Sequence, residues 1–512
     1  MRRVLVLAAT LSLLSVVTGS PPARSQVSGP EMLHPRLGVR TVTTGLVTPI
    51  GLAFLGPGDM LVLEKQTGRV LRVVGGQVTA TVLDLAVNNA SERGLLSIAL
   101  HPEFRSNDYV YLYWSCRTPG PGPDAFTPPA ERCDETAMLG DDTGDILAVP
   151  LLGNRVDRFV WDGSMLTFDR NIIQLRAFQS DGGPAPPGQG DEGQPPRGNH
   201  DGGVIDFGPD GTLYIVVGDL GRRGQLQNLR QGPLGDGSPD DQFGGPEPDN
   251  AHLSGVILRL GDDGTAPADN PFFDVGSAMG GEPGANVQKV FAYGIRNSFG
   301  MAFDPVSGGL WAQENGEDAF DEINLVERGM NSGWIQIAGP VGRIAEYKSI
   351  ETTSLHHEDF PNLQQFRWGP ERIANTPEEA LSRLFALPGS RYSDPEFSWK
   401  HVLAPAGIGF VPGRGLGPQF AGDLFVGFAV PEPLGGPLFR FDLTGNRKKI
   451  AVDDLRLEDR VADNVTFHEM TESESLLIGR DFGIITDIET GPVGKLFVVS
   501  LDQGAVYEIF RR

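Results

Sequence analysis

One histidine of the chain stands where a general base would be useful. His200 lies in the segment RGNHDGG, between a Gly/Pro-rich stretch and an apolar strand–turn–strand pattern. A histidine takes and gives protons near neutral pH, because its unperturbed pKa is about 6.5. The alternative is an exposed loop histidine without a chemical role. His401, which precedes a later pattern of the same kind, is a second candidate.

A second group with chemical potential is an arginine followed by an asparagine. The segment VFAYGIRNSFG places Arg296 and Asn297 directly ahead of another apolar pattern. A planar guanidinium binds anions and can polarise a carbonyl group. The alternative is a structural arginine that ties neighbouring strands together.

The run from residue 312 to residue 334 is dense in side-chain oxygen atoms. Hard cations such as Ca²⁺ bind carboxylates together with backbone carbonyl groups. The spacing does not match an EF-hand loop, so the run predicts either a calcium site of another kind or a solvated acidic loop. Its candidate ligands are Glu314, Asn315, Glu317, Asp318, Asp321 and Glu322.

Several kinds of chemistry are disfavoured. The chain contains no G-x-S-x-G elbow, no H-E-x-x-H motif and no dinucleotide fingerprint after a strand. Serine hydrolases of that plan, zinc peptidases of that type, and nicotinamide or flavin enzymes are therefore not expected. A net charge of −24 argues against a nucleic-acid partner, because phosphates would be repelled.

A repeated pattern explains how distant candidates could meet. Six times an apolar strand runs into a Pro/Gly turn and a second apolar strand, which is typical of hairpins. Further apolar strands lie between the copies. The pattern predicts an all-β fold, a six-bladed β-propeller of four-stranded antiparallel blades with loop insertions. Ligands of propellers bind where the loops converge on the central channel. The copies cover residues 51–65, 95–114, 203–219, 300–314, 407–427 and 484–500.

Helix is expected in few places. The clearest candidate is residues 376–387, with Thr376 as the N-cap, Pro377 at the first helical position and Glu379 placed for a capping box.

The N-terminus reads as an export signal. Arg2 and Arg3 precede an apolar run, Val4–Val17, and small residues follow. We expect a signal peptide at 1–26, a linker at 27–40 and the propeller at 41–512, in a periplasmic or secreted protein. No later stretch has the apolar length of a membrane-spanning helix. In an exported chain, the two cysteines, Cys116 and Cys133, predict a disulfide that clips an insertion, with two free thiols as the alternative.

Taken together, several segments resemble the soluble glucose/sorbosone dehydrogenase family of six-bladed propeller quinoproteins. The resemblance extends over about residues 41–512. It implies oxidation of an aldose or related sugar, with hydride transfer to pyrroloquinoline quinone (PQQ) and electrons passing to an external acceptor. It also implies that His200 is the general base and that Arg296 helps to polarise the quinone. The segments are ERGLLSIALHPEF (92–104), NHDGGVIDFGPDGTLYIVVGD (199–219), 255–273, 290–305 and 314–334.

The same resemblance assigns further residues to the site. It implies cofactor-binding roles for Glu92, Arg296, Asn297, Gly316, Glu317 and Trp399. It implies calcium binding through the Gly316 and Glu317 carbonyl groups, and a structural calcium ion at Glu322 and the Ser332 carbonyl.

The chain departs from the family where cations meet the carboxylates of PQQ. The family has a lysine in the fifth blade and an R-x-R pair at the start of the sixth. Here residues 427–441 contain no lysine, and Ile484 and Thr486 stand in place of the two arginines. Arg480, four residues upstream, is a candidate substitute. Two other hypotheses therefore stay open, namely a calcium-dependent lactonase-like or lyase-like propeller without PQQ, and a non-catalytic propeller that binds carbohydrate or another protein.

Overall fold

The computed structural model covers most of the region expected to form the propeller. It describes residues 29–89, 92–116, 153–177, 200–220, 228, 253–353, 370–430 and 434–512. The expected signal peptide and Cys133 lie outside these ranges, so export and the disulfide stay predictions. None of the helices in the described ranges is long and apolar enough to cross a membrane.

The first three sheets each begin with a meander of four antiparallel strands. The first contains β3 (Pro49–Gly56), β4 (Asp59–Glu64), β5 (Arg69–Val74) and β6 (Gln77–Asp84). The second contains β7 (Leu95–Leu100), β8 (Tyr109–Ser115), β9 (Gly153–Trp161) and β10 (Leu166–Arg176). The third contains β11 (Ile205–Phe207), β12 (Leu213–Val217), β13 (Val256–Leu260) and β14 (Val290–Tyr293), extended by β18 (Met330–Asn331) and β19 (Arg391–Tyr392).

The other three sheets draw strands from more distant parts of the chain. The fourth contains β15 (Met301–Phe303), β16 (Leu310–Glu314), β17 (Ala319–Val326), β20 (Phe397–His401) and β25 (Val461–Ala462). The fifth contains β21 (Pro405–Phe410), β22 (Leu424–Phe428), β23 (Leu438–Leu443), β24 (Ile450–Ala451), β26 (Leu477–Arg480) and β1 (Glu31–Met32). The sixth contains β27 (Ile485–Thr490), β28 (Leu496–Ser500), β29 (Ala505–Arg511) and β2 (Leu37–Thr44).

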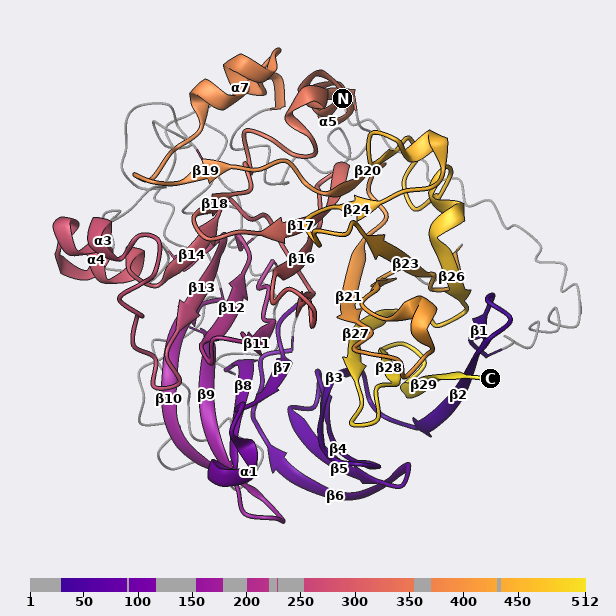
Figure 1. Ribbon diagram of the computed structural model, residues 1–512. Helices are drawn as coiled ribbons and strands as arrows, with labels where there is room; N and C mark the ends of the chain where they lie inside the picture. Colours follow the sequence, from indigo (N-terminus) through magenta and orange to yellow (C-terminus); the bar gives the residue numbers. More distant parts are fainter. Residues whose placement is uncertain are drawn as a thin grey trace, which may run out of the picture.

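The six sheets stand around a common centre (Figure 1). Their first strands contact one another in the closed order β3, β7, β11, β15, β21, β27 and back to β3. The expected all-β, propeller-like arrangement of antiparallel sheets is confirmed. Uniform four-stranded blades were wrong, because three of the sheets carry additional strands. The number of blades stays a prediction, since sheets and four-stranded blades do not correspond one to one.

The ring closes with a strand from near the N-terminus. β2 pairs antiparallel with β29, from Leu37 opposite Arg511 to Thr44 opposite Ala505. β1 pairs with β26. Residues within the expected linker, 27–40, therefore contribute to two sheets, because the edges of β26 and β29 offer unpaired backbone groups that an adjacent strand satisfies.

Helices occupy the insertions, and there are more of them than the sequence indicates. They are α1 (Phe104–Asn107), α3 (Phe273–Met279), α4 (Gly281–Val287), α5 (Ile344–Thr353) and α7 (Pro377–Arg383), with 3₁₀ turns η4 (Val341–Arg343), η6 (Pro370–Arg372), η7 (Pro418–Phe420), η8 (Leu455–Leu457) and η9 (Ser473–Leu476). The expected cap of α7 is confirmed, since the Thr376 hydroxyl oxygen accepts a bond from the Glu379 backbone N–H at 3.2 Å. α7 ends at Arg383, because Leu384 has an extended backbone.

Neighbouring sheets pack through side chains with almost no exposed surface. Between the first two sheets, Leu61 and Leu63 of β4 belong to one cluster with Leu112 and Trp114 of β8. These side chains expose 0% of their surface. The apolar faces of adjacent sheets are therefore the interfaces that hold each first strand in place.

Leu112→Ala tests this packing. We expect the substitution to lower the free energy of unfolding by about 2–5 kcal/mol, because it leaves a cavity between two sheets. Val78→Ala, on the 47% exposed Val78 of β6, is the control and should change it by less than about 0.5 kcal/mol. The measurement is urea unfolding followed by tryptophan fluorescence, and equal stability of the two variants would contradict the assignment.

Candidate functional site

His200 is held at the point where the chain approaches β11. The residue as a whole is 6% exposed, and its backbone has a φ of 59°. Its backbone N–H donates to Glu92 Oε2 at 2.7 Å, and its Nδ1 lies 2.7 Å from Asp219 Oδ1. An ionised Asp219 keeps the imidazole proton on Nδ1, which leaves Nε2 as the acceptor. His200 is thus oriented as a base would need to be.

Asp219 connects this histidine to the arginine segment. The carboxylate is fully buried, and its Oδ2 accepts a bond from Trp334 Nε1 at 2.8 Å. Its backbone N–H donates to the Arg296 carbonyl at 2.8 Å. Gly218, the preceding residue, packs so closely that a Cβ would lie 2.2 Å from the His200 carbonyl oxygen. A side chain at this position would therefore displace the histidine backbone.

Arg296 is buried and paired. Its Nε lies 3.1 Å from Glu317 Oε2, its Nη2 forms an ion pair with the same carboxylate, and its Nη1 donates to the Asn315 carbonyl at 3.0 Å. The guanidinium carbon lies 5.4 Å from the centre of the Trp334 ring. Burial acts to lower the pKa of Arg296, but the charges of Glu317 and Asp219 outweigh it and raise the pKa. The arginine is a fixed positive charge.

Glu92 joins the two segments. In addition to the His200 backbone, its Oε2 accepts a bond from Asn297 Nδ2 at 3.1 Å. Asn297 Oδ1 is buried and has no hydrogen-bond partner within the described ranges. The structure therefore brings together five of the expected site residues, which are Glu92, His200, Arg296, Asn297 and Glu317.

Two buried carboxylates of the acidic run lie opposite one another. Glu314 of β16 and Glu322 of β17 are register partners, and Asn324 Nδ2 lies 3.5 Å and 2.9 Å from their respective carboxylates. The Ser332 hydroxyl donates to Glu314 Oε2 at 2.9 Å. Burial, and next the charge of Glu322, raise the pKa of Glu314, and burial raises the pKa of Glu322 to about 7. A cation at this pair would remove the repulsion.

The backbone at Gly316 turns tightly beside this pair. Its N–H donates to Asp321 Oδ1 at 2.9 Å, and a Cβ would meet the Ala319 carbonyl oxygen at 2.1 Å. No group of three or more His, Cys, Asp or Glu side chains in the described ranges is arranged to hold a metal ion. Calcium also uses carbonyl and amide oxygens, so the expected calcium ligands stay a prediction.

Three other candidates make their described contacts outside the His200 network. The Trp399 ring, 0% exposed, packs against Phe397 and Phe428 in the aromatic core, and the structure does not bring it to the site. His401 is tied through its backbone to Asn464, and burial lowers the pKa of its imidazole. Arg480 of β26 bonds Glu31 at 2.8 Å with 52% of its side chain exposed. The prediction that Arg480 takes the place of the missing arginine pair was therefore wrong.

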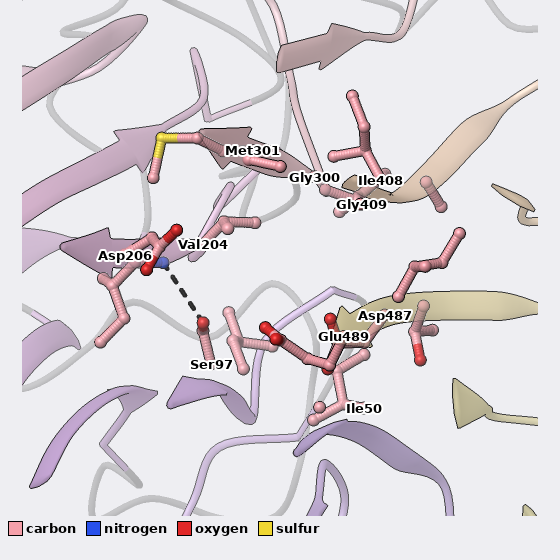
Figure 2. A pocket seen from close by; sticks show the side chains of 18 of the residues that line it. Ile50, Ser97, Val204, Asp206, Gly300, Met301, Ile408, Gly409, Asp487 and Glu489 are labelled. Carbon is pink, nitrogen blue, oxygen red and sulfur yellow. Dashed lines mark hydrogen bonds between the residues drawn. The ribbon is translucent and has the colours of Figure 1, made fainter. Parts of the chain in front are cut away.

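A cavity of about 410 Å³ lies between the first strands, and Glu92 forms part of its wall. Figure 2 shows three further carboxylates of the wall, which sequence reasoning missed: Asp206, Asp487 and Glu489. Burial raises the pKa of Asp206 and of Asp487 to about 7, and that of Glu489 well above its usual range. The alternation of Asp487 and Glu489 along one strand was a usable signal, because residues two apart point to the same face.

Asp206→Asn tests the state of this cavity. A carboxyl whose pKa is raised on folding stabilises the protein below the unfolded pKa of about 4, and this contribution is lost as pH rises through about 7. Between pH 4 and pH 7, the unfolding free energy of the variant should therefore fall by about 1–2 kcal/mol less than that of the wild type. This difference is smaller than the full pKa shift would give, because the cavity admits water. The measurement is urea unfolding at each pH, with Asp453→Asn on an exposed residue as the control. Parallel pH curves for wild type and Asp206→Asn would contradict the assignment.

Comparison with known proteins identifies the family. The family model described as Glucose / Sorbosone dehydrogenase matches residues 46–127 and 191–359. An uncharacterised protein of Synechocystis sp. strain PCC 6803 is 30% identical over 94% of this chain and 88% of its own length. Quinoprotein glucose dehydrogenase B of Acinetobacter calcoaceticus is 28% identical, but the match covers 59% of this chain and only 52% of that protein.

Among solved structures, the PQQ-bound form of aldose sugar dehydrogenase from Streptomyces coelicolor superimposes with a TM-score of 0.53. It is 23% identical, and the alignment covers 93% of this chain and 98% of that chain. At this identity the likeness concerns the fold. The segments that match the family model include Glu92, His200, Arg296 and the acidic run. The chain belongs to the glucose/sorbosone dehydrogenase family.

Proposed function

We propose that this protein oxidises an aldose or related sugar, with His200 as the general base and PQQ as the hydride acceptor. The observation that carries the proposal is the contact between His200 Nδ1 and Asp219, with Arg296 joined to Asp219 through one backbone bond. The names of two relatives, a quinoprotein glucose dehydrogenase and a PQQ-bound aldose sugar dehydrogenase, support the same substrate class and cofactor.

The chain's own residues would handle the proton. The sugar hydroxyl gives its proton to His200 Nε2, and the ionised Asp219 stabilises the imidazolium that forms. The hydrogen on the same carbon leaves as hydride, so the product carries a new C=O bond. PQQ, when bound, supplies the two-electron acceptor for that hydride. Arg296, held in place by Glu317, would supply a positive charge that stabilises the negative charge developing on the hydride acceptor.

The residues present offer acceptors for a hydroxyl-bearing substrate. Asp201 Oδ2 and Asn297 Oδ1 are buried oxygen atoms without a partner in the described ranges, and the hydroxyl groups of a sugar would satisfy them by donating. The chain after Asp201 continues with two glycines that cannot carry a side chain. A Cβ at Gly202 would lie 2.6 Å from the Val216 carbonyl oxygen, and a Cβ at Gly203 would lie 2.6 Å from Leu96. The residues that would hold the cofactor are Glu92, Arg296, Asn297, Gly316 and Glu317.

Finer features belong to the same proposal. Calcium would be held by the Gly316 and Glu317 carbonyl groups, and a second ion by Glu322 and the Ser332 carbonyl. We further propose export by a signal peptide at 1–26, a Cys116–Cys133 disulfide, six blades, and an external electron acceptor.

One observation favours an alternative. Thr486 lines the cavity and bonds only weakly, at 3.4 Å, to the Pro49 carbonyl, where the family has an arginine. A calcium-dependent lactonase-like or lyase-like enzyme, or a carbohydrate-binding propeller, would not need that charge.

His200→Ala tests the proposal. We expect the apoprotein loaded with PQQ and Ca²⁺ to show an altered quinone spectrum and to reduce a dye with aldoses. His200→Ala should lower the rate by about 10²–10⁴-fold while the spectrum of bound PQQ remains, because only the proton acceptor is lost.

The matched control is His101→Ala, because His101 bonds Asn107 in a turn of the second sheet. Its rate should equal that of the wild type. An unchanged quinone spectrum in the wild type would exclude the PQQ proposal, whereas a full rate in His200→Ala would exclude only the base assignment.

A further inference from the structure

We propose that the insertion helix α5 positions the base and the arginine of the site through two side chains on one face, Tyr347 and Glu351. Tyr347 supports the loop that contacts Asp219, and Glu351 supports the loop that pairs with Arg296. The inference rests on the proposed roles of His200 and Arg296. Both α5 side chains are buried and act through these loops, so they are positioning residues.

The spacing of the two residues gives them a common face of the helix. Residues four apart in an α-helix lie one turn apart on the same side. The buried side chains of α5 are Ile344, Tyr347 and Glu351, which recur every three or four positions. α5 lies in the insertion between β18 and β19 and contacts β17, which begins at Ala319. Its buried face can therefore reach the loop just ahead of β17.

Tyr347 holds the loop that carries Trp334. Its hydroxyl donates to the Ile335 carbonyl at 3.1 Å. Trp334, the preceding residue, donates from Nε1 to Asp219 and lies with its ring against the guanidinium of Arg296. The tyrosine hydroxyl thus fixes the backbone next to the one side chain that contacts both of these groups.

Glu351 holds the loop that carries Glu317. Its Oε1 accepts bonds from the backbone N–H groups of Asp318 and Ala319, each at 3.1 Å. Glu317 directly precedes these residues, and its carboxylate forms the ion pair with Arg296. Because Glu351 is 1% exposed, loss of its acceptor would deprive two buried N–H groups of this bond, and the loop would move to satisfy them.

The helix face and the ion pair are close enough to interact electrostatically. Burial raises the pKa of Tyr347, and the charges of Glu351 and Glu317 add to the rise. The charge of Arg296 opposes it. Burial, and next the charges of Asp318 and Glu317, raise the pKa of Glu351 well above its usual range. A protonated carboxyl keeps an oxygen that accepts, so its bonds to the loop do not require ionisation.

The first test measures NMR signals of the full chain without added cofactor, so it does not depend on turnover. Tyr347→Phe removes the hydroxyl and should shift the indole N–H signal of Trp334. Glu351→Leu removes the acceptor and should shift the Nε–H signal of Arg296. Glu351→Gln, which keeps a carbonyl oxygen for both N–H groups, should recover that signal. The indole signal of Trp161, in β9 of the second sheet, is the internal reference and should stay in place.

The second test measures steady-state kinetics of the protein loaded with PQQ and Ca²⁺. We expect Tyr347→Phe and Glu351→Leu to lower kcat for an aldose about 10–100-fold with little change in KM, because a displaced group stabilises the transition state less. The matched control is Glu346→Gln, since Glu346 lies on α5 with 43% of its side chain exposed and pairs with Arg343. It should match the wild type in signals and in rate.

Unmoved Trp334 and Arg296 signals in the folded variants would overturn the inference whether or not the enzyme turns over. A shift of the Trp161 signal as large as the others would also overturn it, because α5 would then support only the general fold. If Glu351→Leu does not fold, Tyr347→Phe decides by the same signals. Selective shifts together with a wild type that does not turn over would support the positioning and overturn the proposed function.

Discussion

The candidate site depends on the closure of the ring of sheets. Glu92 bonds His200, which lies 108 positions further along the chain, and Asn297, which lies 205 positions further along. Each precedes the first strand of a different sheet, β7, β11 or β15. These first strands touch in a closed order, and the pairing of β2 with β29 completes the sixth sheet. Loss of that pairing would open the sixth sheet, whose first strand β27 contacts both β21 and β3 in the ring.

The site tolerates a high density of buried charge because each charge has a specific partner. Arg296 is paired with Glu317, and Asp219 accepts a bond from Trp334 while it contacts His200. Unpaired charges would cost several kcal/mol each in such a setting. No ion pair in the described ranges involves the Glu314–Glu322 pair or the cavity carboxylates Asp206, Asp487 and Glu489, and burial raises the pKa values of all five groups. These are the places where a cation or a proton has most to contribute.

Sequence patterns predicted the parts of this arrangement that depend on local order. The turn-separated apolar strands indicated the sheets, and the position of His200 and Arg296 ahead of such strands indicated that they meet. The role of residues 27–40 was missed, because a strand that pairs with β29 has no local signal for its distant partner. Trp399 was placed by family likeness, yet its alternation along β20 turns it into the aromatic core. Arg480 failed similarly, since sequence proximity to β27 does not show on which edge a side chain lies.

The cavity carboxylates show a different limit. Asp487 and Glu489 alternate within an apolar strand, which indicates a shared polar face. That face becomes a channel wall only when six first strands surround a common space, so the third carboxylate, Asp206, has no sequence relation to the other two. The acidic wall of the cavity is thus a property of the closed ring, because residues far apart in the sequence meet only where the six first strands surround one space.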